Sequence, residues 1–362
     1  MNAENILIIG AGPQALFLVR ELCRLNHDVT LIGRNSEIAM HSKYAKKVFV
    51  ETEENLISEL KQLASEMPKQ KCFVASGFYL SFLMNHFSDF TKLFNVFPSN
   101  AQSVGKLMSK METYQLAHSV DVLYPKSVLL SDINIQLEEL NYPQIIKWNR
   151  DIYLFEKPRF KTTCVKNANE LRDLISKLSE KEKEALVSQD YLGSDLRNNF
   201  SYGAYVIDGE VKLDICVNEV RHFRSGVSSV VEEYTGSFAS EIKNAAFALI
   251  YQTQFTGFLD VEFKIKDGKL YLLEVNPRPF GFIKIMKKKY PDLMLVVMGE
   301  KAESFKNKKP VKWINFLRDM VLIFKKPASV FHMLKLVFDF ENRTFDVWDI
   351  NDPIPFFYQM KR

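Results

Sequence analysis

The chain has 362 residues, of which 47% are hydrophobic and 25% charged, and its formal net charge is +4. This is ordinary globular composition, enough for two or three packed units. The four cysteines form no CxxC pair and the histidines show no HExxH-type spacing, which argues against a disulfide framework, a zinc site and a histidine metal site. No secretory signal or membrane-spanning run is visible, so we expect a soluble, cytoplasmic protein.

The first hundred residues alternate between short apolar runs and segments with helical periodicity. Strands are expected at ILIIG, DVTLIGR, KKVFVET and CFVAS, with helices at PQALFLVRELCRL and ENLISELKQLASEM. Alternation of this kind predicts a parallel sheet that carries helices on both faces.

The middle of the chain mixes helices with hairpins. A helix is expected from about Ser109 to His118 and another at NANELRDLISKL, with strands at YPQIIKW and EALVSQDYL. Two hairpins follow, because Asp208-Gly209 and Asp267-Gly268 each lie between alternating strands, and the helix KNAAFALIYQTQF separates them.

The tail is predicted to be helical and basic. WINFLRDMVLIF carries an apolar stripe from Trp313 to Phe324, and a second helix is expected to begin at Pro327. The segment from Lys284 to Leu336 contains 13 Lys and Arg residues but only 4 Asp and Glu residues. A solvated helical surface explains most such runs. The sharper interpretation is a surface for an anionic partner: a phosphorylated or lipid-linked substrate, or an anionic membrane.

The strongest chemical signal lies on the second hairpin. Glu274 and Asn276 are two residues apart on one strand and therefore face the same way, and Glu262 is expected opposite Leu273 or Glu274. Two carboxylates and an amide oxygen on one face suit Mg²⁺. Arg278 follows, where it could hold a phosphate or another anion. The plain alternative is an exposed strand face with ordinary charges.

Two arginines precede a Gly-Ser loop in NEVRHFRSGVSS. Arg221 and Arg224 could clamp a carboxylate or an acyl phosphate, because guanidinium groups bind planar oxyanions bidentately. An exposed edge strand with solvated arginines is the equally weighted alternative.

These motifs together resemble the ATP-grasp superfamily, and specifically its carboxylate–amine ligases, including those that act on bacterial cell-envelope precursors. EVNPR beside VEF is similar to the metal-binding end of that family, and the match covers about residues 1–282. The resemblance implies that Lys110 and Lys147 bind the phosphates of ATP, and that Gln189, Asp190 and Leu192 form the linker that meets adenine. It also implies that Asp195 meets the ribose, that Glu262, Glu274 and Asn276 hold Mg²⁺, and that Arg278 stabilises an oxyanion.

One part of the family pattern is missing. Relatives have a glycine-rich lid after the second lysine, whereas Trp148 follows Lys147 here and no glycine occurs before Gly193. Something else must cover the phosphates, and Lys157 or Lys161 could contribute charge.

The expected fold is α/β and α+β. It has a Rossmann-like N-terminal domain (1–105), a small lid subdomain (106–188) and a large subdomain with the metal site (189–290). A helical, basic C-terminal extension (291–362) follows. The resemblance implies an ATP- and Mg²⁺-dependent ligase that joins a carboxylate to an amine through an acyl phosphate. Its partners would be small molecules rather than nucleic acid, with a homodimer left open.

Two other functions remain open on the sequence. Gly10-Ala-Gly12-Pro-Gln-Ala15 matches a GxGxxA dinucleotide loop, and Arg34 at the end of the second strand could suit NADP, so an NADP-dependent oxidoreductase is one alternative. It leaves the metal cluster unexplained. The other is an ATP-grasp scaffold that binds nucleotide without catalysis, which the missing lid glycines favour.

Overall fold

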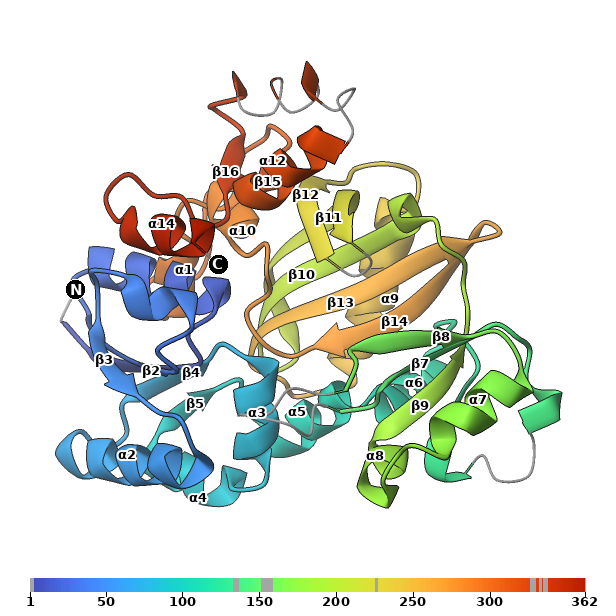
Figure 1. Cartoon of the computed structure of the whole chain (residues 1–362). Coiled ribbons are helices and arrows are strands. Elements are labelled where there is room, and N and C mark those ends of the chain that lie inside the picture. The colour runs from blue at the N-terminus through green and yellow to red at the C-terminus, as the bar shows by residue number, and fades with distance from the viewer. Residues whose placement is uncertain are drawn as a thin grey trace.

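The computed structural model describes residues 3–132, 137–150, 159–224, 227–325, 330–331, 334 and 338–361. Within these residues the strands form three sheets, of five, seven and four strands. Figure 1 shows the blue N-terminal sheet on one side of the molecule and the long strands of the seven-stranded sheet on the other. The described helices include none that is long and apolar enough to cross a membrane.

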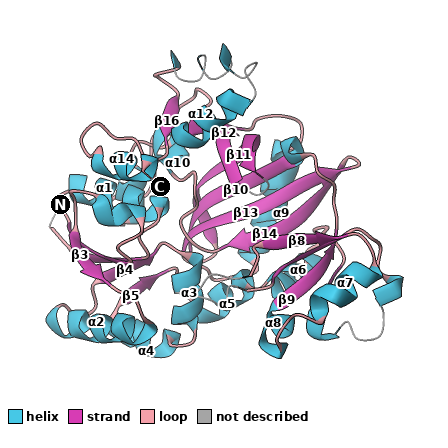
Figure 2. Cartoon of the chain, in the orientation of Figure 1, coloured by secondary structure: helices cyan, strands magenta, loops and turns pink. Residues whose placement is uncertain are grey.

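The N-terminal sheet is parallel, in the order β3-β2-β1-β4-β5. Its strands are β1 (Asn5–Ile9), β2 (Asp28–Gly33), β3 (Lys46–Phe49), β4 (Lys71–Val74) and β5 (Asn95–Phe97). Its helices are α1 (Pro13–Arg24), α2 (Glu53–Glu66), α3 (Gly77–Met84) and α4 (Phe87–Leu93). Alternate residues of β1 enter different cores: Ile6 and Ile8 pack with α1, whereas Leu7 and Ile9 pack with α2, α3 and α4. The expected sheet with helices on both faces is confirmed (Figure 2).

The four-stranded sheet is antiparallel, in the order β6-β9-β7-β8. It comprises β6 (Ser127–Leu129), β7 (Gln144–Trp148), β8 (Thr162–Val165) and β9 (Leu186–Asp190). Against it pack α7 (Ala168–Ile175) and α8 (Glu180–Ala185). Helices α5 (Ala101–Met108) and α6 (Lys110–Ser119) precede the sheet in the chain and pack in the hydrophobic cluster that includes the large sheet. Ile146, Trp148, Leu171 and Leu186 form its separate small core.

The seven-stranded sheet has the order β14-β13-β10-β11-β12-β15-β16. Its strands are β10 (Asn199–Ile207), β11 (Glu210–Arg224), β12 (Val227–Glu233), β13 (Gly257–Lys266), β14 (Lys269–Asn276), β15 (Lys312–Ile314) and β16 (Arg343–Phe345). Helix α9 (Ala239–Tyr251) packs in one hydrophobic cluster with β10. Both predicted hairpin turns form, and all four residues of Asp208-Gly209 and Asp267-Gly268 have positive φ, the conformation that such two-residue turns require.

The C-terminal segment differs from the expected all-helical extension. It contains α10 (Lys284–Lys289), α11 (Leu293–Val297), α12 (Phe316–Lys325) and α14 (Ile354–Met360), but β15 and β16 also extend the large sheet. The prediction that the helix includes Trp313 is wrong, because Trp313 pairs with Val231 on β12. Sheet pairing thus overrides the helical spacing of the apolar residues there. The helix expected from Pro327 falls largely outside the described residues.

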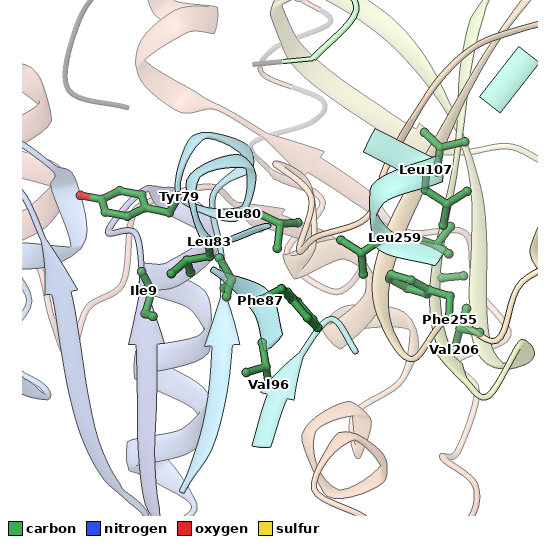
Figure 3. Close-up of a cluster of buried hydrophobic side chains, with 14 of the residues drawn as sticks. Ile9, Tyr79, Leu80, Leu83, Phe87, Val96, Leu107, Val206, Phe255 and Leu259 are labelled. Atoms are coloured by element: carbon green, nitrogen blue, oxygen red, sulfur yellow. The ribbon is translucent and has the colours of Figure 1, made fainter. Parts of the chain in front are cut away.

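One hydrophobic cluster joins the N-terminal unit to the large sheet. Figure 3 shows Ile9, Leu83 and Phe87 on one side and Val206 and Leu259 on the other, with further side chains between them. Because the cluster is continuous, the parallel sheet and the large sheet are packed against each other rather than connected only by a linker.

Candidate active site

The hairpin of β13 and β14 brings the predicted metal ligands together. Glu262 pairs directly with Glu274, as the sequence predicts, and Asp260 pairs with Asn276 in the next row of the same face. Asn276 Nδ2 donates to Glu262 Oε1 at 3.1 Å and to Glu274 Oε1 at 3.3 Å. The amide therefore bridges the two carboxylates and fixes their spacing.

Two predicted phosphate-binding lysines converge on this cluster from other elements. Lys110, the first residue of α6, places its Nζ 3.0 Å from Glu274 Oε2. Lys147, on β7, is near enough to Lys110, Glu262 and Glu274 for their charges to act on it. Burial, reinforced by the Lys110 charge, lowers the pKa of Lys147 to about 8, although the two carboxylates oppose this shift.

The carboxylates experience opposite electrostatic environments. Burial alone raises the pKa of Glu274, but Lys110 and Lys147 outweigh it and hold that pKa below its usual range. Burial, followed by the charges of Glu274 and Asp260, raises the pKa of Glu262 well above its usual range. The charge of Lys161, an exposed residue just before β8, acts to lower the pKa of both glutamates.

The donor set of this cluster fits Mg²⁺. A divalent cation would offset the repulsion that raises the pKa of Glu262, and oxygen ligands from two carboxylates and an amide match its preference. No group of three or more His, Cys, Asp or Glu side chains with metal-binding geometry occurs among the described residues. Phosphate oxygens and water would therefore have to complete the coordination.

Arg278 lies at the end of the same hairpin. Its Nη1 donates to the Pro279 carbonyl at 3.0 Å, and its Nη2 lies 3.4 Å from Asn276 Oδ1. Its charge also acts on Asp260. The guanidinium is thus held beside the cluster of predicted metal ligands, where an anion could reach its remaining N–H groups.

Of the two predicted arginines on β11, the structure describes the side chain of Arg221. Arg221 Nη1 lies 2.5 Å from Asp319 Oδ2 of α12, and Asp319 is fully buried and also accepts from Ser229 Oγ. This partner, almost a hundred residues later, could not be read from the sequence, and it gives Arg221 a structural role. Binding of an anion by Arg221 stays a prediction. The side chain of Arg224, and residues 151–158 where a lid would fall, lie outside the described residues.

The predicted adenine linker begins with the last two residues of β9. The Gln189 side chain points inward, where its Nε2 donates to Tyr114 Oη at 2.5 Å and to Ser127 Oγ at 3.0 Å. Asp190 Oδ1 accepts from Gln144 Nε2 at 2.7 Å, and Leu192 is half-buried. A cavity of about 310 Å³ adjoins the linker. Its lining includes Lys126, Ser127, Gln144, Ser188 and Asp190.

The predicted ribose ligand Asp195 is exposed at the surface. Hydrogen bonds from Arg197 hold the pKa of its carboxyl below the usual range. Lys264 Nζ donates to the Asp195 carbonyl at 2.8 Å and so fixes the loop between the linker and β10. A ribose hydroxyl would have to share this carboxylate with Arg197.

Sequence reasoning missed two acidic residues at the site. Asp260 shares the face of Glu262, and simple alternation along β13 would have revealed it. Glu219 is near enough to raise the pKa values of Asp260 and Glu262, and it accepts from Ser228 and contacts His222 Nε2 at 2.7 Å. Irregular register between Asn218 and Arg224 puts Glu219 beyond the reach of a sequence pattern.

The N-terminal glycine loop is occupied by the chain's own carboxylate. Glu37 accepts from the Ala11 amide at 3.3 Å and the Arg34 amide at 2.8 Å, and from Tyr79 Oη at 3.1 Å. A dinucleotide pyrophosphate would need the Ala11 amide of this loop, so it would have to displace Glu37. This geometry weighs against the NADP alternative.

No family model matches the chain, and no curated protein matches it in sequence. Solved structures do match. N5-carboxyaminoimidazole synthetase from Staphylococcus aureus, complexed with ADP, is 17% identical, with a TM-score of 0.66 over 86% of this chain and 82% of that one. L-amino acid ligase from Bacillus licheniformis is 17% identical, with a TM-score of 0.61 over 84% of this chain and 76% of that one.

A third match is biotin carboxylase from Campylobacter jejuni, 14% identical, with a TM-score of 0.64 over 84% of this chain and 72% of that one. These likenesses establish the fold. The chain has the ATP-grasp fold behind a Rossmann-like N-terminal sheet, as the sequence motifs indicated.

Proposed function

We propose that the protein is an ATP- and Mg²⁺-dependent ligase that joins a carboxylate to an amine. The observation that carries the proposal is the convergence of Lys110 and Lys147 on the bridged pair Glu262 and Glu274, with Lys110 Nζ 3.0 Å from Glu274 Oε2. Lysines from a helix and a small sheet that face carboxylates of a large sheet form a site for a metal-bound polyphosphate. The structural neighbours, which include an ADP-bound N5-carboxyaminoimidazole synthetase and an L-amino acid ligase, support the same chemistry.

Each residue has a distinct role in this proposal. Lys110, Lys147 and Lys161 neutralise the phosphate chain of ATP. Backbone groups from Gln189 to Leu192 hold adenine, and Asp195 receives the ribose. Glu262, Glu274 and Asn276 hold Mg²⁺, which supplies charge neutralisation at the transferring phosphate. For the amide oxygen of Asn276 to bind a cation, its NH₂ group must rotate away from the two carboxylates.

The reaction proceeds in two displacements. A substrate carboxylate oxygen bonds to the γ-phosphorus of ATP, the bond to the bridging oxygen breaks, and ADP leaves. The substrate ammonium first loses a proton to solvent. The amine nitrogen then bonds to the acyl carbon and loses a second proton to solvent, and inorganic phosphate leaves with the C–O bond electrons. Arg278 stabilises the tetrahedral oxyanion between these events. The protein needs no nucleophile of its own.

The test is phosphate release from ATP with Mg²⁺ across mixtures of amino acids and sugar acids. Glu274→Gln should reduce the rate by about a hundredfold or more, because it removes a ligand charge from the reacting centre. Glu210→Gln is the matched control, since Glu210 is an exposed strand residue whose carboxylate, among the residues that the structure describes, pairs with Lys212 alone. Tight MgATP binding without phosphate release in any mixture would instead identify a nucleotide-binding scaffold.

The acceptor class is a finer proposal. The basic segment from Lys284 to Leu336 supports an anionic acceptor, such as a cell-envelope polysaccharide precursor, or a peripheral contact with anionic lipid. Phe331 within this segment and Phe338 just after it are 83% and 64% exposed, which suits a lipid surface. Sedimentation with phosphatidylglycerol vesicles at low salt tests the membrane version, and a lack of co-sedimentation there would rule it out.

A further inference from the structure

A cavity of about 740 Å³ lies between the first helix and the C-terminal segment. Its described lining shares no residue with the proposed nucleotide site. Helices α1 and α10 and the segment that follows β16 contribute to it, and Figure 1 shows these elements together at the upper left, away from β7 and β8. The charged side chains of the lining are Glu21, Arg24, Lys284, Lys287, Lys288 and Asp349.

Helical spacing explains why the cations gather in this cavity. Lys284, Lys287 and Lys288 are three and four residues apart on α10, so they share one face of that helix. Glu21 and Arg24 share one face of α1 for the same reason. The cavity thus lies where a basic face of α10 meets a mixed face of α1.

The lining carries four cationic groups but only two carboxylates, and both carboxylates already have partners. Glu21 Oε1 lies 2.7 Å from Arg24 Nη1, and Glu21 Oε2 lies 3.0 Å from Lys287 Nζ. Asp349 forms an ion pair with the same arginine. The cations left over are Lys284 and Lys288.

These two lysines have no carboxylate partner among the described residues. Lys284 Nζ donates to the carbonyls of Phe345 at 3.0 Å and Trp348 at 3.5 Å, and Lys288 forms no ion pair there. Desolvation, reinforced by the charge of Arg20, lowers the pKa of Lys284 to about 8, although nearby carboxylates oppose this shift. An anion in the cavity would offset the surplus of positive charge.

The same cavity has an aromatic wall. Phe17 is 2% exposed and Trp348 is 37% exposed, and both line it. Phe356 of α14 packs edge-to-face against Trp348, with the ring centroids 5.1 Å apart, and so holds the indole in place. A ligand would therefore meet lysines and an aromatic surface in one cavity.

We infer that this cavity binds a phosphate monoester that carries an aromatic ring or an alkyl chain. A phosphate monoester has close to two negative charges at neutral pH, which match the two lysines without carboxylate partners. A carboxylate has one charge and would leave one lysine unmatched. The ring or chain would cover the Trp348 indole. The inference goes beyond the ligase proposal and does not depend on it.

Isothermal titration calorimetry with phenyl phosphate and with inorganic phosphate tests the two parts of the ligand separately. Lys288→Gln should raise the dissociation constants of both by about fivefold or more, because it removes a charge that pairs with the phosphate. Lys301→Gln is the matched control and should stay within about twofold of wild type. It also lies in the basic segment, but it pairs with Asp292 and does not line the cavity.

The aromatic wall has its own test. Wild type should bind phenyl phosphate about tenfold or more tightly than inorganic phosphate, because the ring buries apolar surface against Trp348. Trp348→Leu keeps an apolar side chain beside Phe356. It should abolish this preference while the dissociation constant of inorganic phosphate stays within about twofold. An unchanged preference would overturn the role of Trp348.

A soluble metabolite and the headgroup of phosphatidic acid present the same chemistry, and sedimentation with phosphatidic acid vesicles at physiological ionic strength distinguishes them. Co-sedimentation that Lys288→Gln loses and Lys301→Gln keeps supports a lipid headgroup. Binding of phenyl phosphate without co-sedimentation supports a soluble ester. Binding of neither probe, or equal effects of the two lysine variants, would overturn the inference. None of these measurements needs ATP, so failure of the ligase proposal would leave their outcome unchanged.

Discussion

At the scale of single residues, the site is governed by how positive charge is divided among its lysines. Lys110 forms an ion pair with Glu274. The half-buried Lys147 has no such ion pair among the described residues, and desolvation together with the nearby Lys110 charge lowers its pKa to about 8. The protonated form of Lys147 is therefore only modestly favoured at neutral pH. Binding of a polyphosphate would stabilise that form and raise its pKa.

This predicts that MgATP binding depends on pH. Between pH 7 and pH 9 the free protein loses the Lys147 proton, so the dissociation constant for MgATP should rise, by about tenfold per pH unit above pH 8. Isothermal titration calorimetry at a series of pH values measures it. Lys147→Arg is the matched variant, because guanidinium stays charged, and its affinity should be nearly constant over the same range. A wild-type curve as flat as that of the variant would contradict the prediction.

At the scale of elements, the two Asp-Gly hairpins have the same turn but different surroundings. A Cβ at Gly209 would lie 2.3 Å from the Thr253 carbonyl oxygen, whereas a Cβ at Gly268 would meet nothing within 4 Å. Both glycines have positive φ, at 80° and 71°. The first turn is thus packed against the end of α9, and the second is open to solvent.

Alanine substitution at these two turns should separate backbone strain from steric clash. Gly268→Ala should lower the free energy of unfolding by about 1 kcal/mol, from positive-φ strain alone. Gly209→Ala should lower it by about 3 kcal/mol, because the clash with the Thr253 carbonyl adds to the same strain. Urea titration followed by circular dichroism measures both. Equal losses would show that the segment at Thr253 moves aside without cost.

Elements with strong local signals were predictable from the sequence. The pairing of Glu262 with Glu274 followed from a two-residue turn and strand alternation, because both rules act within a few residues. The helical prediction for Trp313 was wrong, and the prediction for Arg221 missed its partner, because both depend on residues far away in the sequence. Trp313 belongs to a strand only because β12 offers it an edge, and the partner of Arg221 lies on a helix 98 residues away. Long-range pairing leaves no periodic trace in either segment.

At the scale of the whole molecule, the C-terminal segment is anchored to the first helix. Arg20 is buried and places its Nε 2.9 Å from Asp352 Oδ2, and it also donates to the Val347 carbonyl at 2.8 Å. Ser42 Oγ donates to the same Asp352 oxygen at 2.7 Å. Tyr358 of α14 stacks on His41 with ring centroids 3.5 Å apart. The two ends of the described chain therefore stabilise each other.

Removing one member of this anchor should be costly. Asp352→Ala should lower the free energy of unfolding by about 3–5 kcal/mol, because Arg20 would remain buried without its counter-charge. Asp349→Ala, which removes a partner of the more exposed Arg24, should cost under about 1 kcal/mol. Guanidinium denaturation measures both. The double variant Arg20→Leu/Asp352→Leu removes both charges. If it is as unstable as Asp352→Ala, lost packing rather than the unpaired charge explains the loss of stability.

The same anchor sets an order of events during synthesis. Arg20 emerges from the ribosome 332 residues before Asp352, the only carboxylate to which the described structure joins it. Until that residue arrives, the guanidinium must stay in water, and the face of α1 that carries it cannot be sealed. A nascent chain that already holds every residue of the proposed nucleotide site thus still has an open N-terminal sheet, and the segment from Val347 to Asp352 closes it.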